Sequence, residues 1–128
     1  FGHTLGHAIE FATILDGEET LRHGEAVALG MLAIFRISIE LGYLDECRIT
    51  WLKDILKKFN LPITYTASNL SMDKDSLLDI CMTLVLKDKK RNFDGLRLII
   101  LTEDRVPSIH ETNDMELLRL GFKEIICD

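Results

Sequence analysis

The stretch LRHGEAVALGMLAIFRISIEL, residues 21–41, contains the longest helical pattern in the chain. Apolar or small residues recur every three or four positions along it, which is the spacing of one helix face. The members of that stripe are Val27, Met31, Ile34, Ser38 and Leu41. Small residues on the remaining faces, at positions 26, 28, 30 and 33, are suited to close packing against other helices. Because this helix is apolar on more than one face, we expect it to pass through the middle of the domain.

Shorter helices are predicted on both sides of it. HTLGHAIEFATIL, residues 3–15, predicts a helix, and the polar DGEET at 16–20 separates it from the long one. Gly42 ends the long helix. A third helix is expected over 45–59, with its inner face formed by Ile49, Leu52, Ile55, Leu56 and Phe59. Met31, Phe35 and Trp51 are predicted to be core residues.

The C-terminal part combines a helix, a hairpin and another helix. Ser71 is the predicted N-cap of a helix that runs to about Leu86, and the charged run at 88–95 is predicted to be a loop. Residues 96–101 and 106–110 are expected to pair as an antiparallel hairpin whose second strand, with Pro107, lies at an edge. Asn113 with Glu116 indicates the cap of a last helix to about residue 126.

Composition restricts the function. The chain has 128 residues and 47% hydrophobic content, which suits a single domain over 1–128. Its net charge of −6 argues against nucleic-acid or anionic-membrane binding. It has neither an apolar run near the roughly 20 residues of a membrane span nor the pattern of a signal peptide.

Three cysteines, at positions 47, 81 and 127, are far apart and form no CxxC pair. The sequence therefore signals neither a thiolate zinc site nor a redox motif. We interpret them as inert thiols in a reducing cytoplasm.

Three of the four histidines lie within the first 23 residues. His3 and His7 are four positions apart in a predicted helix, so both imidazoles can face one site. A helix–loop–helix return would bring His23 beside His3. HTLGH is not the HExxH of metalloproteases, because Thr4 occupies the position of the glutamate. On spacing alone, both a metal site and a structural or surface role remain open.

The sequence motifs around these histidines are more specific than their spacing. FGHTLGHAIE and HGEAVALGM, followed by LKDKKRNFDGLRLIIL, resemble the motifs of the 3-dehydroquinate synthases and the wider sugar phosphate cyclases, in the same order along the chain. The resemblance implies a mainly α fold with one small antiparallel hairpin, the helical C-terminal domain of a two-domain enzyme. The NAD-binding domain of the family has no counterpart in residues 1–128. Since Phe1 already stands inside the first motif, we expect the chain to be part of a longer protein.

The resemblance also implies roles for individual residues. His3 and His23 match the family's zinc ligands, and His7 matches the histidine assigned to proton transfer. Lys89, the first lysine of the DKK block, matches the lysine that contacts an anionic group of the substrate. The third zinc ligand of the family is a glutamate that precedes this segment.

The implied activity is that of an NAD- and zinc-dependent carbon–oxygen lyase, with cobalt as another possible metal. It cyclises 3-deoxy-D-arabino-heptulosonate 7-phosphate to 3-dehydroquinate and releases phosphate, in the shikimate pathway. NAD is reduced and reoxidised within one turnover. A cytoplasmic homodimer acting on a sugar phosphate, without nucleic acid or membrane as partner, is expected for the full-length enzyme, and the isolated chain is expected to be inactive.

Three alternatives remain. Other sugar phosphate cyclases, such as 2-deoxy-scyllo-inosose or valiolone-type synthases, share the histidine motifs, but their substrates lack the carboxylate that a lysine at position 89 would contact. Metal-dependent alcohol or glycerol dehydrogenases share the two-domain architecture, but HGEAV and DKK argue against them. A non-catalytic helical module is the alternative of a different class.

Several residues near the motifs are assigned lesser roles. Glu10 or Glu25 can orient an imidazole, although a solvated or helix-capping carboxylate is the commoner case. The glycines at 2, 6 and 24 are expected to allow close backbone approach. Lys90 and Arg91 are interpreted as surface charges, and His110 is assigned no function.

Overall fold

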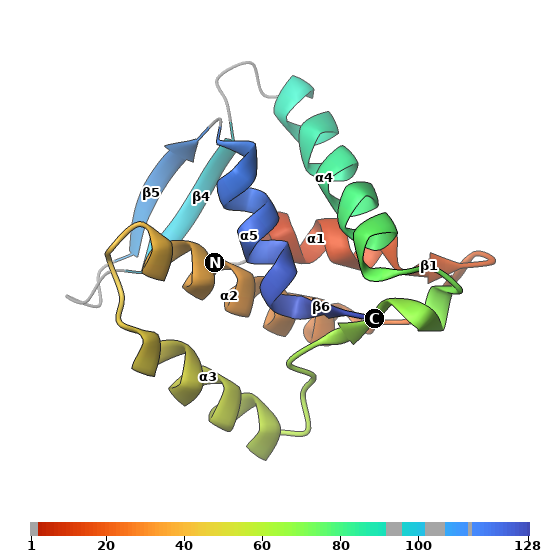
Figure 1. The fold of residues 1–128 in the computed structure, drawn as a ribbon, viewed down its shortest axis with the longest axis horizontal. Coiled ribbons are helices and arrows are strands. Elements are labelled where there is room, and N and C mark those ends of the chain that lie inside the picture. The colour runs from red at the N-terminus through yellow and green to blue at the C-terminus, as the bar shows by residue number, and fades with distance from the viewer. Residues whose placement is uncertain (1–2, 92–95, 102–106, 113) are drawn as a thin grey trace.

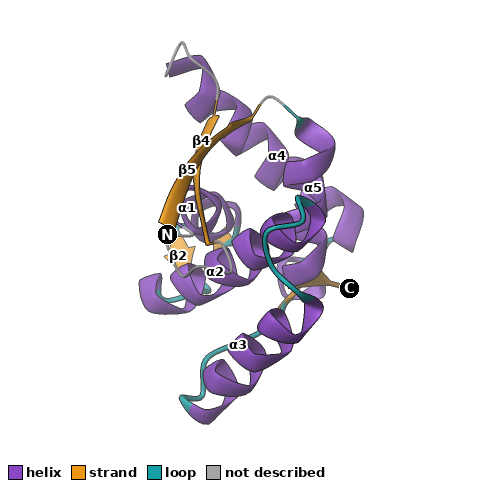
Figure 2. Cartoon of the chain, turned by 90° about the vertical axis from the view of Figure 1, so that its left-hand side faces the viewer, coloured by secondary structure: helices purple, strands orange, loops and turns teal. Residues whose placement is uncertain are grey.

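The long helix predicted from the sequence is the centre of the fold. The computed structural model describes residues 3–91, 96–101, 107–112 and 114–128, with side chains described for 5–87 and 114–128. In it α2 (His23–Glu40) packs against α1, α3, α5 and strand β4 (Figure 1). The other helices are α1 (His3–Ala12), α3 (Glu46–Lys58), α4 (Lys74–Arg91), α5 (Met115–Ile125) and a short 3-10 helix, η1 (Ala67–Leu70). Figures 1 and 2 both place α4 and α3 at opposite ends of the molecule, with α2 and α5 between them.

The strands are short and pair in three separate two-stranded sheets among the described residues. β4 (Leu96–Leu101) and β5 (Pro107–Thr112) form the predicted antiparallel hairpin, in which Leu98 lies opposite His110. Two further pairs were not predicted. β1 (Ile14–Leu15) and β2 (Glu18–Glu19) are antiparallel, whereas β3 (Tyr65–Thr66) and β6 (Ile126–Cys127) are parallel. The parallel pair joins distant parts of the chain, so no local sequence pattern signals it.

The core lies between α2 and the helices around it. Ten residues of α2 are buried, which confirms that it runs through the interior. The largest fully buried side chains are Phe122, Leu5, Ile9, Leu29, Leu32, Ile34, Ile37, Leu77, Leu78 and Leu118. None of the helices in the described part of the chain combines the length and apolarity that crossing a bilayer requires.

Glycines and small residues bring neighbouring helices close to α2. A Cβ on Gly6 of α1 would lie 3.1 Å from the carbonyl oxygen of Ala26, and one on Gly121 of α5 would lie 2.8 Å from Cδ1 of Ile37. Close approach at Gly6 was predicted. The same prediction for Gly24 is wrong, because a Cβ there would meet nothing within 4 Å, and Gly2 lies outside the described residues.

The predicted burial of α3 is only partly confirmed. Ile49, Leu52 and Leu56 are buried, but Trp51 is 54% exposed and Phe59 is 73% exposed. Both predictions of inward-facing aromatics are therefore wrong. The physical reason is that α3 lies at the edge of the molecule, where only one narrow face of it meets α2 (Figure 2).

Helix boundaries differ from the predictions at several ends. α1 stops at Ala12, because the next residues form the β1–β2 hairpin. Ser71 is not the N-cap of α4: it is the C-cap of η1, with a left-handed backbone (φ 57°). The cap of α4 is Asp73, whose Oδ1 accepts a 2.8 Å hydrogen bond from the Ser76 amide. That bond to the backbone also lowers the pKa of Asp73.

The charged run after residue 87 was predicted to be a loop, which is wrong for its first part. α4 continues to Arg91, so Lys89 lies in the last turn of a helix. Lysine and arginine are good helix formers, and their charge is favourable near a helix C-terminus. The rest of the predicted loop, residues 92–95, lies outside the described residues.

The last helix has the predicted position but a different cap. Oδ1 of Asp114 accepts hydrogen bonds from the amides of Glu116 and Leu117, at 3.1 and 3.3 Å. Asn113, the residue predicted to cap it, lies outside the described residues.

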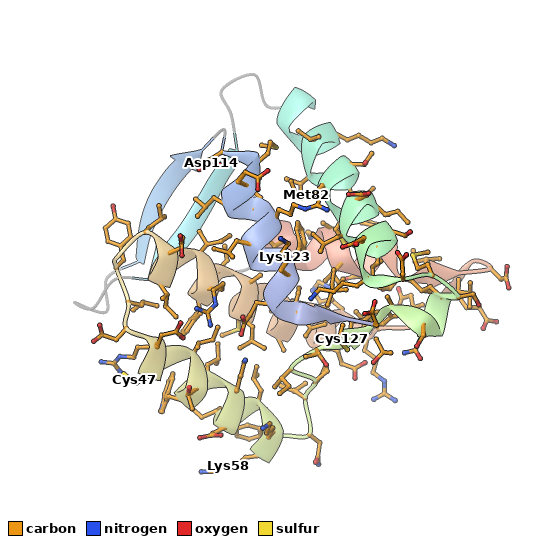
Figure 3. The ribbon with its side chains drawn as sticks, in the orientation of Figure 1. Cys47, Lys58, Met82, Asp114, Lys123 and Cys127 are labelled. Atoms are coloured by element: carbon orange, nitrogen blue, oxygen red, sulfur yellow. The ribbon has the colours of Figure 1, made fainter. Side chains whose placement is uncertain are left out.

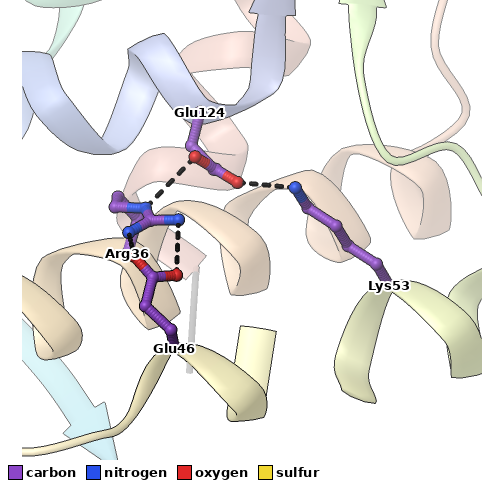
Figure 4. Close-up of polar contacts among 4 residues, drawn as sticks. All are labelled: Arg36, Glu46, Lys53 and Glu124. Carbon is purple, nitrogen blue, oxygen red and sulfur yellow. Dashed lines mark hydrogen bonds and ion pairs between the residues drawn. The ribbon is translucent and has the colours of Figure 1, made fainter. Parts of the chain in front are cut away.

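An ion-pair network joins three helices (Figure 4). Arg36 of α2 bonds to Glu46 of α3 and to Glu124 of α5, and Lys53 of α3 bonds to the other oxygen of Glu124 at 2.7 Å. The hydrogen bond between Arg36 and Glu46 raises the pKa of the guanidinium and lowers that of the carboxyl group. The network attaches α3, which buries little surface, to the α2–α5 pair.

The cysteines are all free and differ in exposure: Cys47 is exposed, Cys127 is half-buried and Cys81 is buried. Figure 3 shows Cys47 and Cys127 at separate parts of the molecule. Burial raises the pKa of the Cys81 thiol to about 12. Since the thiolate is the reactive form, Cys81 is expected to be inert, as the sequence indicated. That interpretation does not extend to Cys47, which is exposed.

We therefore expect an aromatic disulfide reagent to modify Cys47 rapidly in the folded protein at mildly alkaline pH. Cys81 should react only after denaturant is added, because it is both buried and protonated. The measurement is the number and order of modified thiols by peptide mass spectrometry. Reaction of Cys81 at the rate of Cys47 in the folded protein would contradict this.

Candidate metal and substrate site

The β1–β2 hairpin returns the chain so that α2 starts beside α1. Asp16 and Gly17 form its turn, both with positive φ (53° and 80°), the combination that a tight two-residue hairpin turn requires. The hydroxyl of Thr20 donates its one hydrogen to the Thr13 carbonyl, and it accepts a 2.7 Å hydrogen bond from the hydroxyl of buried Tyr65. The polar DGEET segment thus forms an ordered turn.

This return brings two of the three N-terminal histidines together. The ring centroids of His7 and His23 are 5.9 Å apart, with the ring planes tilted by 42°. His7 is half-buried and also stacks on Phe11, whose ring centroid is 6.2 Å away. His23, the first residue of α2, has a side chain that is 62% exposed. The site is therefore an open surface at the junction of α1 and α2.

His3 is one helical turn before His7 in α1, so the two residues occupy the same helix face. Its side chain lies outside those that the structure describes, and so does the side chain of Lys89. The predicted ligand pair of His3 and His23 and the predicted substrate contact of Lys89 remain predictions. Among the described side chains, no three histidine, cysteine or acidic residues gather closely enough to hold a metal ion.

Glu10 contacts His23, although a solvated or helix-capping role was the commoner expectation for it. Its Oε2 lies 2.8 Å from Nδ1 of His23, and its side chain is 15% exposed. Glu25, the other candidate, has the capping role instead: Oε1 accepts a 2.9 Å hydrogen bond from the Arg22 amide at the start of α2. The sequence placed both glutamates near the histidines and gave no signal that distinguished one from the other.

This arrangement fits a divalent metal in the chemistry of its donors. A carboxylate only accepts hydrogen bonds, so Nδ1 of His23 carries a proton, and in the neutral ring Nε2 then keeps a free lone pair. Neutral imidazole is a preferred ligand of zinc and of similar metals. The fold and site together define a helical domain that holds two histidine rings side by side, one of them bound to a carboxylate.

Comparison with known proteins agrees with that class. The family model described as 3-dehydroquinate synthase C-terminal matches residues 1–91. The 3-dehydroquinate synthase of Caldanaerobacter subterraneus subsp. tengcongensis is 46% identical over 122 residues, covering 93% of this chain and 31% of that protein. The Clostridium tetani 3-dehydroquinate synthase is 32% identical over 120 residues, covering 93% of this chain and 29% of that protein. The chain belongs to the 3-dehydroquinate synthase C-terminal family.

A solved structure supports the fold assignment. The crystal structure of 2-deoxy-scyllo-inosose synthase complexed with carbaglucose-6-phosphate, NAD+ and Co2+ superposes with a TM-score of 0.63 at 22% identity, covering 98% of this chain and 33% of that one. The mainly helical fold is therefore that of the matched third of 2-deoxy-scyllo-inosose synthase. The chain spans about 30% of the length of the curated relatives it matches.

Proposed function

We propose that this chain is the C-terminal part of a 3-dehydroquinate synthase, which cyclises 3-deoxy-D-arabino-heptulosonate 7-phosphate to 3-dehydroquinate with loss of phosphate. The observation that carries the proposal is the pair of imidazoles, His7 and His23, held 5.9 Å apart in a chain of this family. The full-length enzyme would belong to the shikimate pathway and act as a cytoplasmic homodimer. By itself, the chain is expected not to turn over substrate.

In this proposal, His3 and His23 bind a divalent metal, and His7 transfers a proton to or from the substrate. When bound, the metal, zinc or cobalt, polarises substrate hydroxyls, and NAD accepts and returns a hydride. His7 is suited to its role because an imidazole exchanges protons near neutral pH, and its ring is next to that of His23. NAD itself would be bound mainly by residues outside this chain.

The related cyclase activity of 2-deoxy-scyllo-inosose synthase is less well supported. The likeness to that enzyme is 22% in sequence and supports the shared fold. The family model and the curated relatives reported above are 3-dehydroquinate synthases. A lysine at position 89 also suits a substrate that carries a carboxylate, since its ammonium group supplies a point charge.

Lys89→Ala in the full-length enzyme tests this choice. We expect a fall in kcat/KM of about 10- to 100-fold for the carboxylate-bearing seven-carbon sugar phosphate, because a charge-assisted contact to the substrate is lost. Stability should change by less than about 0.5 kcal/mol, since alanine is an even better helix former in the last turn of α4. The measurements are steady-state phosphate release and a thermal melt.

Lys90→Ala is the matched control, because it removes the same charge from the neighbouring position of α4. It should leave kcat/KM nearly unchanged. Equal losses for the two variants, or unchanged kinetics for Lys89→Ala, would remove the reason for preferring a carboxylate-bearing substrate.

A further inference from the structure

Glu10 and His23 form a contact that links two helices at the site. Oε2 of Glu10, in the last turn of α1, lies 2.8 Å from Nδ1 of His23, the first residue of α2. The glutamate side chain is 15% exposed, whereas the histidine side chain is 62% exposed. The carboxylate is thus set into the surface, and the imidazole projects from it.

The packing of α1 on α2 determines where this carboxylate lies. Leu5 and Ile9 of α1 are fully buried, and Gly6 allows the helix to approach the backbone of Ala26 closely. The backbone of a glutamate on such a closely packed helix has less freedom to move than that of a glutamate on a mobile surface segment. The position of its oxygen relative to His23 therefore follows from the helix packing.

The contact selects one form of the histidine. Because a carboxylate is only an acceptor, it stabilises the tautomer with the proton on Nδ1 and leaves Nε2 with its lone pair. It also restricts rotation of an otherwise exposed ring. In metal sites, a carboxylate bound to the far nitrogen of a histidine ligand has this effect on ring orientation and basicity.

We propose that Glu10 is a positioning residue, which holds His23 in the Nδ1-protonated tautomer so that Nε2 is directed to a divalent cation. This inference rests on the proposed function, in which His23 is a metal ligand. Glu25 does not share the role, because its carboxylate binds the Arg22 amide. Loss of such a carboxylate is expected to weaken metal binding by about 10- to 100-fold.

The test is a Co2+ titration of the full-length protein after its metal has been removed, followed by the visible absorption of the bound ion and repeated with Zn2+ in competition. Glu10→Ala should raise the dissociation constant for Co2+ by about 10- to 100-fold and alter the absorption band. Glu10→Gln should largely restore both, since its amide oxygen can still accept from Nδ1. Nitrogen NMR of the metal-free protein should show His23 protonated at Nδ1 in the wild type and a mixture of tautomers in Glu10→Ala.

Two further variants separate the possible failures. Glu25→Gln removes a negative charge two residues from His23 and keeps the capping acceptor, so metal affinity should be unchanged. His23→Ala gives the effect of losing the ligand itself. If His23→Ala weakens Co2+ binding and Glu10→Ala does not, or if Glu10→Gln loses as much as Glu10→Ala, the positioning role is wrong. If His23→Ala binds Co2+ as the wild type does, the proposed metal site is wrong, and the positioning role of Glu10, which depends on that site, is wrong as well.

Discussion

Replacing Phe122 with alanine is expected to lower the free energy of unfolding by about 3–5 kcal/mol, the largest stability effect that we predict. Phe122 is fully buried in α5, the helix that packs against both α2 and α4. Removing its ring would take apolar surface out of the core and leave a cavity that α2, itself closely packed, is poorly placed to fill. The measurement is a urea titration followed by circular dichroism.

Phe59→Ala is the matched control for this change. The same atoms are removed, but Phe59 is 73% exposed at the end of α3. Its replacement should alter stability by no more than about 0.5 kcal/mol. Similar losses for the two variants would mean that the core is not centred on the α2–α5 contact.

His23→Ala is expected to have the largest effect on activity. In the full-length enzyme, it should weaken metal binding by more than the roughly 10- to 100-fold expected for loss of a carboxylate behind a ligand. Turnover should fall as well, because little metal would be bound to the variant at the metal concentrations used in the assay. The melting temperature of the metal-free protein should barely change, since the side chain is 62% exposed and fills no core space. Metal content, phosphate release and a thermal melt measure the three effects.

His110→Ala provides the comparison, because it removes a histidine that lies in β5 and has no proposed role. It should retain metal and turnover. If His23→Ala keeps a full complement of metal and normal turnover, then the proximity of its ring to His7 has no part in catalysis.

The elements of this fold were largely predictable because their signals are local. The three-to-four spacing in residues 21–41 predicted α2 within two residues at each end, and Gly42, with φ of 84°, ends it. β4 and β5 were predicted from a β-rich run and a following edge strand. Family membership was also predictable, because the motifs containing His7 and His23 are contiguous in the sequence.

The errors had two causes: the position of an element within the whole molecule, and a second local signal that outweighed the first. Trp51 was predicted to be buried because aromatic side chains favour the core, but the position of α3 at the edge of the molecule leaves it exposed. Lys89 was predicted to lie in a loop because its neighbours are charged, although charged residues with high helix propensity readily extend a helix.

By itself, the sequence determined where the α-helices that the structure describes lie, although not all of their ends. It also determined that α2 is apolar on more than one face, and which histidines are candidates for the site. These properties depend on residue type and on spacing within a single element. Only the tertiary structure decided that Glu10, rather than Glu25, binds Nδ1 of His23. Both glutamates are near the histidines in sequence, and the choice between them follows from how closely α1 and α2 pack, a distance set by side chains from the whole core.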